Sequence, residues 1–194
     1  MTTTAIVLAS GPSLTAEQIA AAKASGHFTI VVNGTYKSML DADAMYAGDF
    51  LFWKINFADA IKTFKGKLWT QDNSAAARWP KLNRIRGTNR DGLGKDMIHL
   101  GGNSGYQAIN AAYIWGYRRI ILLGFDMKLG PKGEKHHHPD HPAPLVQAQV
   151  FGEWIHKMQK FSKDLKAAGC EVLNATPGSA LTCFPAVDWR EVLK

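Results

Sequence analysis

Four histidines and one aspartate lie within six residues of this chain, in the segment Lys135-His136-His137-His138-Pro139-Asp140-His141-Pro142. Imidazole groups titrate near neutral pH, so they can act as general bases, hydrogen-bond to phosphate or bind a transition metal. The prolines oppose a helix and predict an extended loop. Catalysis or phosphate contact, a metal site and an inert loop all stay open. His138 and His141 are the favoured catalytic residues, because the neighbouring prolines limit how their side chains can turn away.

A second group of candidates lies near the start of the chain, where an apolar run gives way to a turn and a helical pattern. Residues 5–9 are short and apolar, as expected of a buried strand. Ser10-Gly11-Pro12-Ser13 then leads into a helix predicted to begin at Leu14 with Ser13 as its N-cap. Backbone N–H groups at a helix N-terminus bind anions, and Gly11 lets a ligand approach the backbone. We therefore expect this turn to contact a phosphate; a turn without a ligand is the alternative.

Another glycine-rich turn, Gly101-Gly102-Asn103-Ser104-Gly105, precedes a helical pattern that extends to Trp115. Asn103 is predicted to cap this helix, and the backbone amides together with the Ser104 hydroxyl could hold a phosphate. The turn is neither a P-loop, because no Gly-Lys-Ser/Thr follows, nor a dinucleotide-binding fingerprint. It predicts an anion site of a different kind.

Small polar residues also follow several predicted strands. They are Asn33, Asp49, Asp126, Asn174 and Ser179. The carboxyl ends of parallel strands meet at one edge of a sheet, so we expect these residues to line one small-molecule site with the two glycine-rich turns. Asn and Asp are also common turn formers, which is the alternative reading of the pattern.

The elements that must position these residues alternate along the whole chain. The predicted strands cover residues 5–9, 28–32, 44–47, 67–70, 84–85, 119–123 and 170–173. One predicted helix begins at residue 14, and others cover residues 50–64, 103–115 and 188–193. A further long helix is predicted within residues 145–168. This alternation predicts an α/β fold: a Rossmann-like, doubly wound, mainly parallel sheet with helices on both faces, in a single domain over residues 1–194. Residues 127–144 are predicted to form a lid loop over the site.

The composition supports one well-packed domain, since 46% of the 194 residues are hydrophobic and 20% are charged. The chain has neither a run of about 18 apolar residues nor a signal-peptide pattern, so we expect a cytoplasmic protein without a membrane span. Its two cysteines, Cys170 and Cys183, fit neither a disulfide framework nor a metal-ligand spacing, and both are expected to be reduced thiols.

Positive charge is concentrated in one segment of a chain whose formal net charge is +7. The basic residues of this cluster are Arg78, Lys81, Arg84, Arg86, Arg90 and Lys95. They accompany Trp79 and a glycine-containing loop, residues 87–94, that is expected to be exposed and mobile. Such a segment could bind a nucleic acid, a nucleotide or an acidic acceptor, or it could be a solvated loop.

The order of these motifs resembles the bacterial sialyltransferases of glycosyltransferase family 42. The matching residues are Gly11-Pro12-Ser13-Leu14, Asn33, Asn103-Ser104-Gly105, Gly116-Tyr117-Arg118-Arg119-Ile120 and Gly124-Phe125-Asp126. The same motifs resemble the motility-associated-factor (DUF115) proteins and the archaeal 6-hydroxymethylpterin pyrophosphokinases. The whole chain is similar to a group of small proteins encoded in prophages. The likeness to the sialyltransferases covers residues 4–126 and, more faintly, 161–181.

This resemblance implies a transferase that uses a nucleotide-linked donor, with a CMP-sugar favoured. Direct displacement is the expected mechanism: the glycine-rich helix starts stabilise the leaving nucleotide while a histidine removes the proton of an acceptor hydroxyl. The catalytic histidine and paired tyrosines of the family's lid have no match here. By the resemblance, the residues that would contact the nucleotide are Gly11, Ser13, Asn33, Ser104 and Gly105, with Asn174 and Ser179 close by.

Asp49 departs from the family, which usually offers an Asn there. A carboxylate would repel phosphates unless a cation lay between them. The departure leaves room for a second hypothesis, pyrophosphoryl transfer from ATP with Mg²⁺ held by Asp49 and Asp126. A third is a non-catalytic phage accessory protein that binds a nucleotide or nucleic acid in the cytoplasm of an infected or lysogenic bacterium. The acceptor is not identified, and a homo-oligomer stays open.

Overall fold

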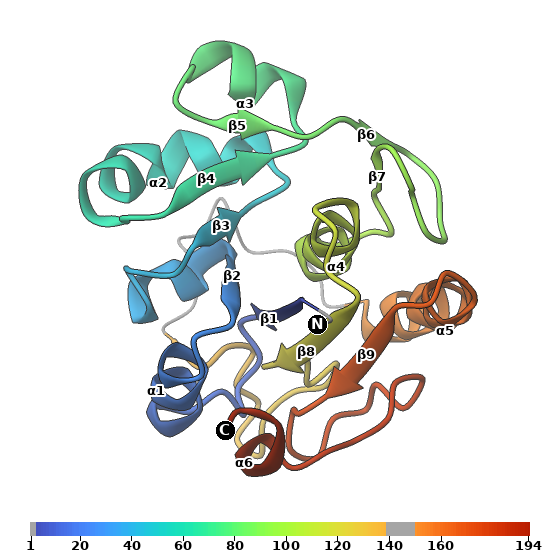
Figure 1. Ribbon diagram of the computed structural model, residues 1–194. Helices are drawn as coiled ribbons and strands as arrows, with labels where there is room; N and C mark the ends of the chain where they lie inside the picture. The colour runs from blue at the N-terminus through green and yellow to red at the C-terminus, as the bar shows by residue number, and fades with distance from the viewer. Residues whose placement is uncertain (1–2, 139–149) are drawn as a thin grey trace.

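The computed structural model describes residues 3–138 and 150–194, which form an α/β domain around a seven-stranded parallel sheet (Figure 1). Across the sheet the strand order is β5-β4-β3-β2-β1-β8-β9. The strands are β1 (Thr4–Leu8), β2 (Phe28–Val32), β3 (Ala44–Tyr46), β4 (Lys67–Thr70), β5 (Asn83–Arg84), β8 (Arg119–Leu123) and β9 (Glu171–Asn174). The chain runs outward from β1 to β5 and then returns to the other side of β1 at β8. This reversal creates a switch point between β1 and β8, the position at which open α/β sheets bind ligands.

Helices cover both faces of the sheet. The α-helices are α1 (Ala16–Ala24), α2 (Phe50–Thr63), α3 (Asn73–Arg78), α4 (Ser104–Ile114), α5 (Phe151–Ala167) and α6 (Trp189–Val192). The buried side chains of α4 and α5 share one core with alternate strand residues such as Val7 and Ile30. Those of α1, α2 and α3 share a second core with the intervening residues, such as Ile6 and Val31. Within the described residues, no helix has the length and apolar character needed to cross a membrane.

The parallel sheet with helices on both faces confirms the predicted fold class. The sequence could predict it because strands that are buried on both faces are apolar almost throughout, and such runs are easily recognised. The bounds of β2, β4 and β8 agree with the prediction. β3 ends one residue earlier than predicted, and β1, β5 and β9 are each shifted by one residue. The predicted helices at residues 50–64, 103–115 and 188–193 correspond to α2, α4 and α6.

One helix start was predicted wrongly. The N-cap of α1 is Thr15, not Ser13, because Thr15 and Gln18 form a reciprocal capping box: Thr15 Oγ1 accepts from the Gln18 N–H (3.3 Å) and Gln18 Oε1 accepts from the Thr15 N–H (2.9 Å). The long helix predicted within residues 145–168 is present as α5. Residues 139–149 lie outside the described residues.

Four elements were not predicted: the 3₁₀ helix η1 (Asn33–Ser38), α3, and the strands β6 (Gly87–Thr88) and β7 (Ile98–His99). β6 and β7 pair in parallel and form a separate two-stranded sheet. The short strands contain too few residues to show a periodicity in the sequence.

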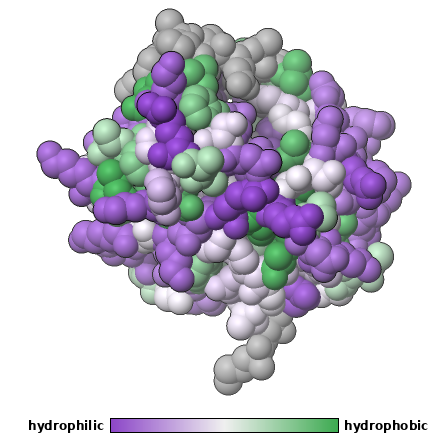
Figure 2. Space-filling view, turned by 90° about the horizontal axis from the view of Figure 1, so that it is seen from above, coloured by the Kyte–Doolittle hydropathy of each residue, from purple (hydrophilic) through white to green (hydrophobic). Residues whose placement is uncertain are grey.

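The basic cluster begins at the end of α3, passes through the edge strand β5 and continues along the chain that follows. All six of its Lys and Arg side chains are exposed, and Figure 2 shows mostly hydrophilic residues on the face above these elements. The glycine-containing loop is less exposed than expected, because Gly92 and Gly94 are buried. Gly92 exchanges hydrogen bonds with the Tyr106 hydroxyl (2.7 and 2.8 Å), and Gly94 exchanges them with the Asn110 side chain (3.1 and 2.7 Å). These contacts anchor the loop to α4.

Candidate functional site

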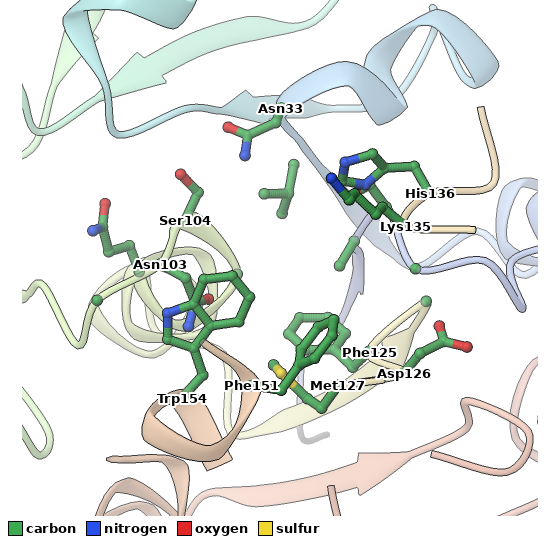
Figure 3. Close-up of a pocket in the computed structure, with 18 of the residues that line it drawn as sticks. Asn33, Asn103, Ser104, Phe125, Asp126, Met127, Lys135, His136, Phe151 and Trp154 are labelled. Atoms are coloured by element: carbon green, nitrogen blue, oxygen red, sulfur yellow. The ribbon is translucent and has the colours of Figure 1, made fainter. Parts of the chain in front are cut away.

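A cavity of about 250 Å³ lies at the carboxyl ends of β1, β2 and β8, at the switch point of the sheet. The starts of α2, α4 and α5 and residues from the segment after β8 complete its wall. Figure 3 shows Asn33 on one side of this space and Phe151 and Trp154 on the opposite side. The cavity therefore combines a polar wall with an aromatic one.

Eight of the residues proposed from the sequence line this cavity. They are Gly11, Pro12, Asn33, Asp49, Asn103, Ser104, Gly105 and Asp126. Ser13, His138, Asn174 and Ser179 are not among its lining residues. His141 lies outside the described residues, as does the part of the predicted lid loop from residue 139 to residue 144.

The turn at Gly11-Pro12-Ser13 is occupied by a carboxylate of the protein itself. The Ser13 N–H donates to Asp126 Oδ1 (3.1 Å), and the Ser13 hydroxyl donates to Asp126 Oδ2 (3.0 Å). The Gly11 N–H donates to the Gly124 carbonyl (2.9 Å), and Pro12 has no N–H to offer. The backbone donors of this turn are therefore directed to protein acceptors. Burial raises the pKa of Asp126, although the hydrogen bonds from Ser13 oppose that rise.

The turn before α4 has a different arrangement. Asn103 caps the helix as predicted, because its Oδ1 accepts from the Tyr106 N–H (2.8 Å). That bond fixes the orientation of the amide, and the buried Asn103 Nδ2 has no hydrogen-bond partner among the described residues. The N–H groups of Ser104 and Gly105 are the first of the helix and have no acceptor within it. The Ser104 hydroxyl accepts from the Gly48 N–H (3.3 Å), so its own proton can be donated to a ligand.

Backbone strain is also located at this cavity. Asn33 (φ 50°) and Met127 (φ 51°) are the non-glycine residues with positive φ in the described part of the chain, and both line the cavity. Such a conformation costs roughly 1–3 kcal/mol and often marks a functional site. The buried Asn33 Oδ1 has no hydrogen-bond partner among the described residues. Strain and an unused acceptor at Asn33 both indicate that this wall is shaped for a ligand.

Cationic and imidazole groups come from the segment that follows β8. Lys128, Lys135 and His136 line the cavity, and Figure 3 shows Lys135 and His136 together on the side of Asn33. His136 Nδ1 and Ser10 Oγ are 3.0 Å apart and share a hydrogen bond. Ser10 belongs to the turn that was expected at the site, whereas the two lysines had not been chosen as site residues from the sequence, although Lys135 directly precedes the first histidine.

His137 does not line the cavity with His136 and instead contacts the backbone of Ser10, just after β1. Its N–H donates to the Ser10 carbonyl (3.0 Å), and its Nε2 lies 3.2 Å from Ser38 Oγ. Burial and the neighbouring His138 lower the pKa of His137 to about 4, while the contact with the Ser10 carbonyl opposes that shift. His137 is therefore neutral near pH 7 and connects the segment to Ser10, in the turn that follows β1.

Asp49 is the second carboxylate of the cavity. It precedes α2 but makes no side-chain capping hydrogen bond. Its surroundings exclude water and Asp72 lies nearby, and both effects raise the pKa of Asp49. Both Asp126 oxygens accept hydrogen bonds from Ser13, and no cluster of three His, Cys, Asp or Glu residues that could hold a metal occurs in the described part of the chain.

Asn174 and Ser179 instead brace the turn after β9. Asn174 Nδ2 donates to the Leu181 carbonyl (3.0 Å), and its Oδ1 accepts from the Thr176 N–H (3.2 Å). The Ser179 hydroxyl donates to the Phe125 carbonyl (2.6 Å). These side chains hold the backbone next to the cavity, and their polar atoms are used in doing so.

Two aromatic residues at the cavity were missed from the sequence. Phe151 and Trp154 lie in the first turn of α5, with ring centroids 5.7 Å apart and planes at 84°. A signal was present, since Trp154 continues the helical spacing of Met158, Phe161 and Leu165. That spacing alone does not distinguish a core residue from a ligand contact.

Comparison of the chain with protein-family models, with curated proteins and with solved structures gives no match.

Proposed function

We propose that this protein is a transferase that binds a nucleotide-linked donor in the cavity between β1, β8 and α4, with a CMP-sugar as the favoured donor. The observation that carries the proposal is the amino end of α4. There, Ser104 and Gly105, the first residues of the helix, line a cavity that is also lined by Lys128 and Lys135. Helix N-termini and lysines both favour phosphate oxygens.

In this proposal the donor phosphate binds at Ser104 and Gly105, where the helix dipole and the lysine charges stabilise the leaving nucleotide. An acceptor hydroxyl attacks the sugar carbon. The bond from that carbon to the phosphate oxygen breaks, and the phosphate keeps the electron pair. His136 receives the acceptor proton as general base. We assign this role to His136 rather than to His138 or His141 because His136 lines the cavity and its ring is held by Ser10.

The pyrophosphokinase alternative receives less support, since it needs Asp126 as a Mg²⁺ ligand and the Asp126 carboxylate is held by Ser13. Figure 3 shows this carboxylate turned away from Asn33 and Ser104. A donor held by amides and lysines does not depend on that carboxylate.

The proposal is tested by measuring thermal stability of the full chain with CMP, UDP, GDP and ATP, each with and without Mg²⁺. A ligand at about 100 times its dissociation constant stabilises by about 2.7 kcal/mol. We expect stabilisation by a nucleotide without Mg²⁺. Stabilisation by ATP that requires Mg²⁺ would support the pyrophosphokinase, and no stabilisation by any nucleotide would contradict the proposed site.

The catalytic step is tested by the release of nucleotide from the donor that binds. His136→Gln should reduce turnover by about a hundredfold or more with little change in donor affinity. His156→Gln is the matched control, because His156 is exposed and does not line the cavity. If His136→Gln turns over normally while the His138→Gln, His141→Gln double variant does not, the base lies elsewhere in the histidine segment.

A further inference from the structure

The aromatic wall of the cavity is not explained by the packing of either core. Phe151 and Trp154 are half-buried, and within the described residues neither ring belongs to, or packs against, the two core clusters. Both line the cavity. Large apolar side chains in such a position leave surface that a ligand can cover.

The placement follows from the geometry of α5. Met158, Phe161 and Leu165 form the buried stripe of this helix and pack on the sheet. Trp154 lies one turn before Met158 on the same stripe. There the indole lines the cavity, and the Phe151 ring contacts it edge-to-face.

A hydrogen-bond donor lies beside this indole. Figure 3 draws the Asn103 amide behind the Trp154 indole, and the capping bond to Tyr106 leaves Asn103 Nδ2 as the group without a hydrogen-bond partner among the described residues. A Cβ at Gly102 would lie 3.5 Å from Trp154 Cδ1, which places the ring against the glycine-rich turn itself. A flat apolar surface and a buried amide donor are therefore adjacent.

We infer that Trp154 is the surface on which the nucleobase of the ligand stacks, with Phe151 supporting the indole and Asn103 Nδ2 donating to an acceptor on the edge of the base. This inference rests on the proposed function, since it assigns the base to one end of a nucleotide whose phosphate binds at Ser104 and Gly105. Every nucleobase has a π face that an aromatic ring can cover, and every base offers a carbonyl or ring nitrogen as an acceptor.

The experiment measures binding of two kinds of probe to the full chain by calorimetry. The first kind is a set of nucleoside monophosphates, CMP, UMP, GMP and AMP, of which the tightest binder is used. The second is ribose 5-phosphate, which keeps the sugar and the phosphate but has no base. Trp154→Ala should weaken the nucleotide by roughly fivefold or more, the loss typical of removing a base-stacking ring. It should change the affinity for ribose 5-phosphate by no more than about twofold, because this probe has no base to stack on the indole.

Two variants calibrate the result. Trp154→Phe should retain most of the nucleotide affinity, because a phenyl ring also stacks. Trp189→Ala removes a half-buried indole that does not line the cavity, and it should not change either affinity. Thermal unfolding of each variant without ligand verifies that the chain is folded.

The outcomes separate this inference from the proposed function. Unchanged nucleotide affinity in Trp154→Ala, or equal losses for both probes, would overturn the stacking role while the phosphate site stands. The same holds if the native chain binds no nucleotide more tightly than ribose 5-phosphate. If the native chain binds neither probe, the proposed function fails and the stacking role fails with it.

Discussion

Two glycine-rich turns border the same cavity but use their backbone donors differently. At Gly11-Pro12-Ser13 the donors are satisfied by the protein, chiefly by the Asp126 carboxylate. At Asn103-Ser104-Gly105 the N–H groups of Ser104 and Gly105 have no acceptor within the helix, and the Asn103 Nδ2 donor has no hydrogen-bond partner among the described residues. Both turns resemble anion sites in sequence, yet the first already contains an anion of the protein. The availability of a glycine-rich turn for a ligand is thus decided by contacts from elsewhere in the chain.

Substituting the glycines should produce the largest difference between the two turns. A Cβ at Gly11 would overlap the Asp126 carboxylate and the Gly124 carbonyl oxygen. A backbone oxygen cannot move away easily, so Gly11→Ala should destabilise the fold by about 3 kcal/mol or more. At Gly105 a Cβ would come within 3.0 Å of a Phe125 ring carbon, which a small shift relieves. Gly105→Ala should therefore cost about 1 kcal/mol in denaturant unfolding, and equal losses at the two glycines would contradict the comparison.

Removal of the internal anion is the next test. Asp126→Ala removes two hydrogen bonds and leaves the Ser13 N–H without its acceptor, so the free energy of unfolding should fall by about 2–3 kcal/mol. We expect nucleotide affinity to change little, since the ligand is assigned to the other turn. A variant that is as stable as the native chain but no longer binds nucleotide would show that Asp126 serves the ligand and not the fold.

The attachment of His137 to Ser10, beside the first turn, predicts a dependence of stability on pH. Burial lowers the pKa of His137 to about 4 from an ordinary value of 6.5. A lowered pKa in the folded state means that this contribution to stability is present above pH 6.5 and is lost as the pH falls toward 4. With allowance for solvent near the ring, the loss should be about 2 kcal/mol. Denaturant unfolding of the native chain and His137→Asn between pH 7 and pH 4 measures it, and parallel pH profiles would contradict the assignment.

The parts of this fold that the sequence could predict are those with a local physical signature. β2, β4 and β8 are apolar runs bounded by polar residues, and their bounds agree with the prediction. The α3 helix was missed although Asp72 is a recognisable cap, whose Oδ1 accepts from the Ala75 N–H (2.8 Å). η1 lacks a side-chain cap and gave no such signal.

The candidate site was predictable only as a location. From the rule that the carboxyl ends of parallel strands share one edge, Asn33 and Ser104 were predicted to lie at one site, and both line the same cavity. The pairing of Ser13 with Asp126 joins residues 113 positions apart, so no local pattern could indicate it. The position of Trp154 at the cavity could not be predicted either, because helical spacing does not show whether a side chain packs in the core or lines a cavity.

The smallest expected effects come from a matched pair of serines, one in each turn, and they test the comparison most directly. Ser13→Ala removes a bond to Asp126, so it should lower the free energy of unfolding by about 1 kcal/mol and leave nucleotide affinity within about twofold. Ser104→Ala removes the hydroxyl assigned to the phosphate and should weaken binding by about 0.5–1.5 kcal/mol. Its effect on stability should be the lesser one, because the bond that it accepts from Gly48 is long (3.3 Å). Calorimetric titration measures the nucleotide affinity of each variant, and denaturant unfolding measures the free energy of unfolding of each. If Ser13→Ala weakens binding as much as Ser104→Ala does, the first turn contacts the ligand after all, and Asp126 must move aside when the ligand binds.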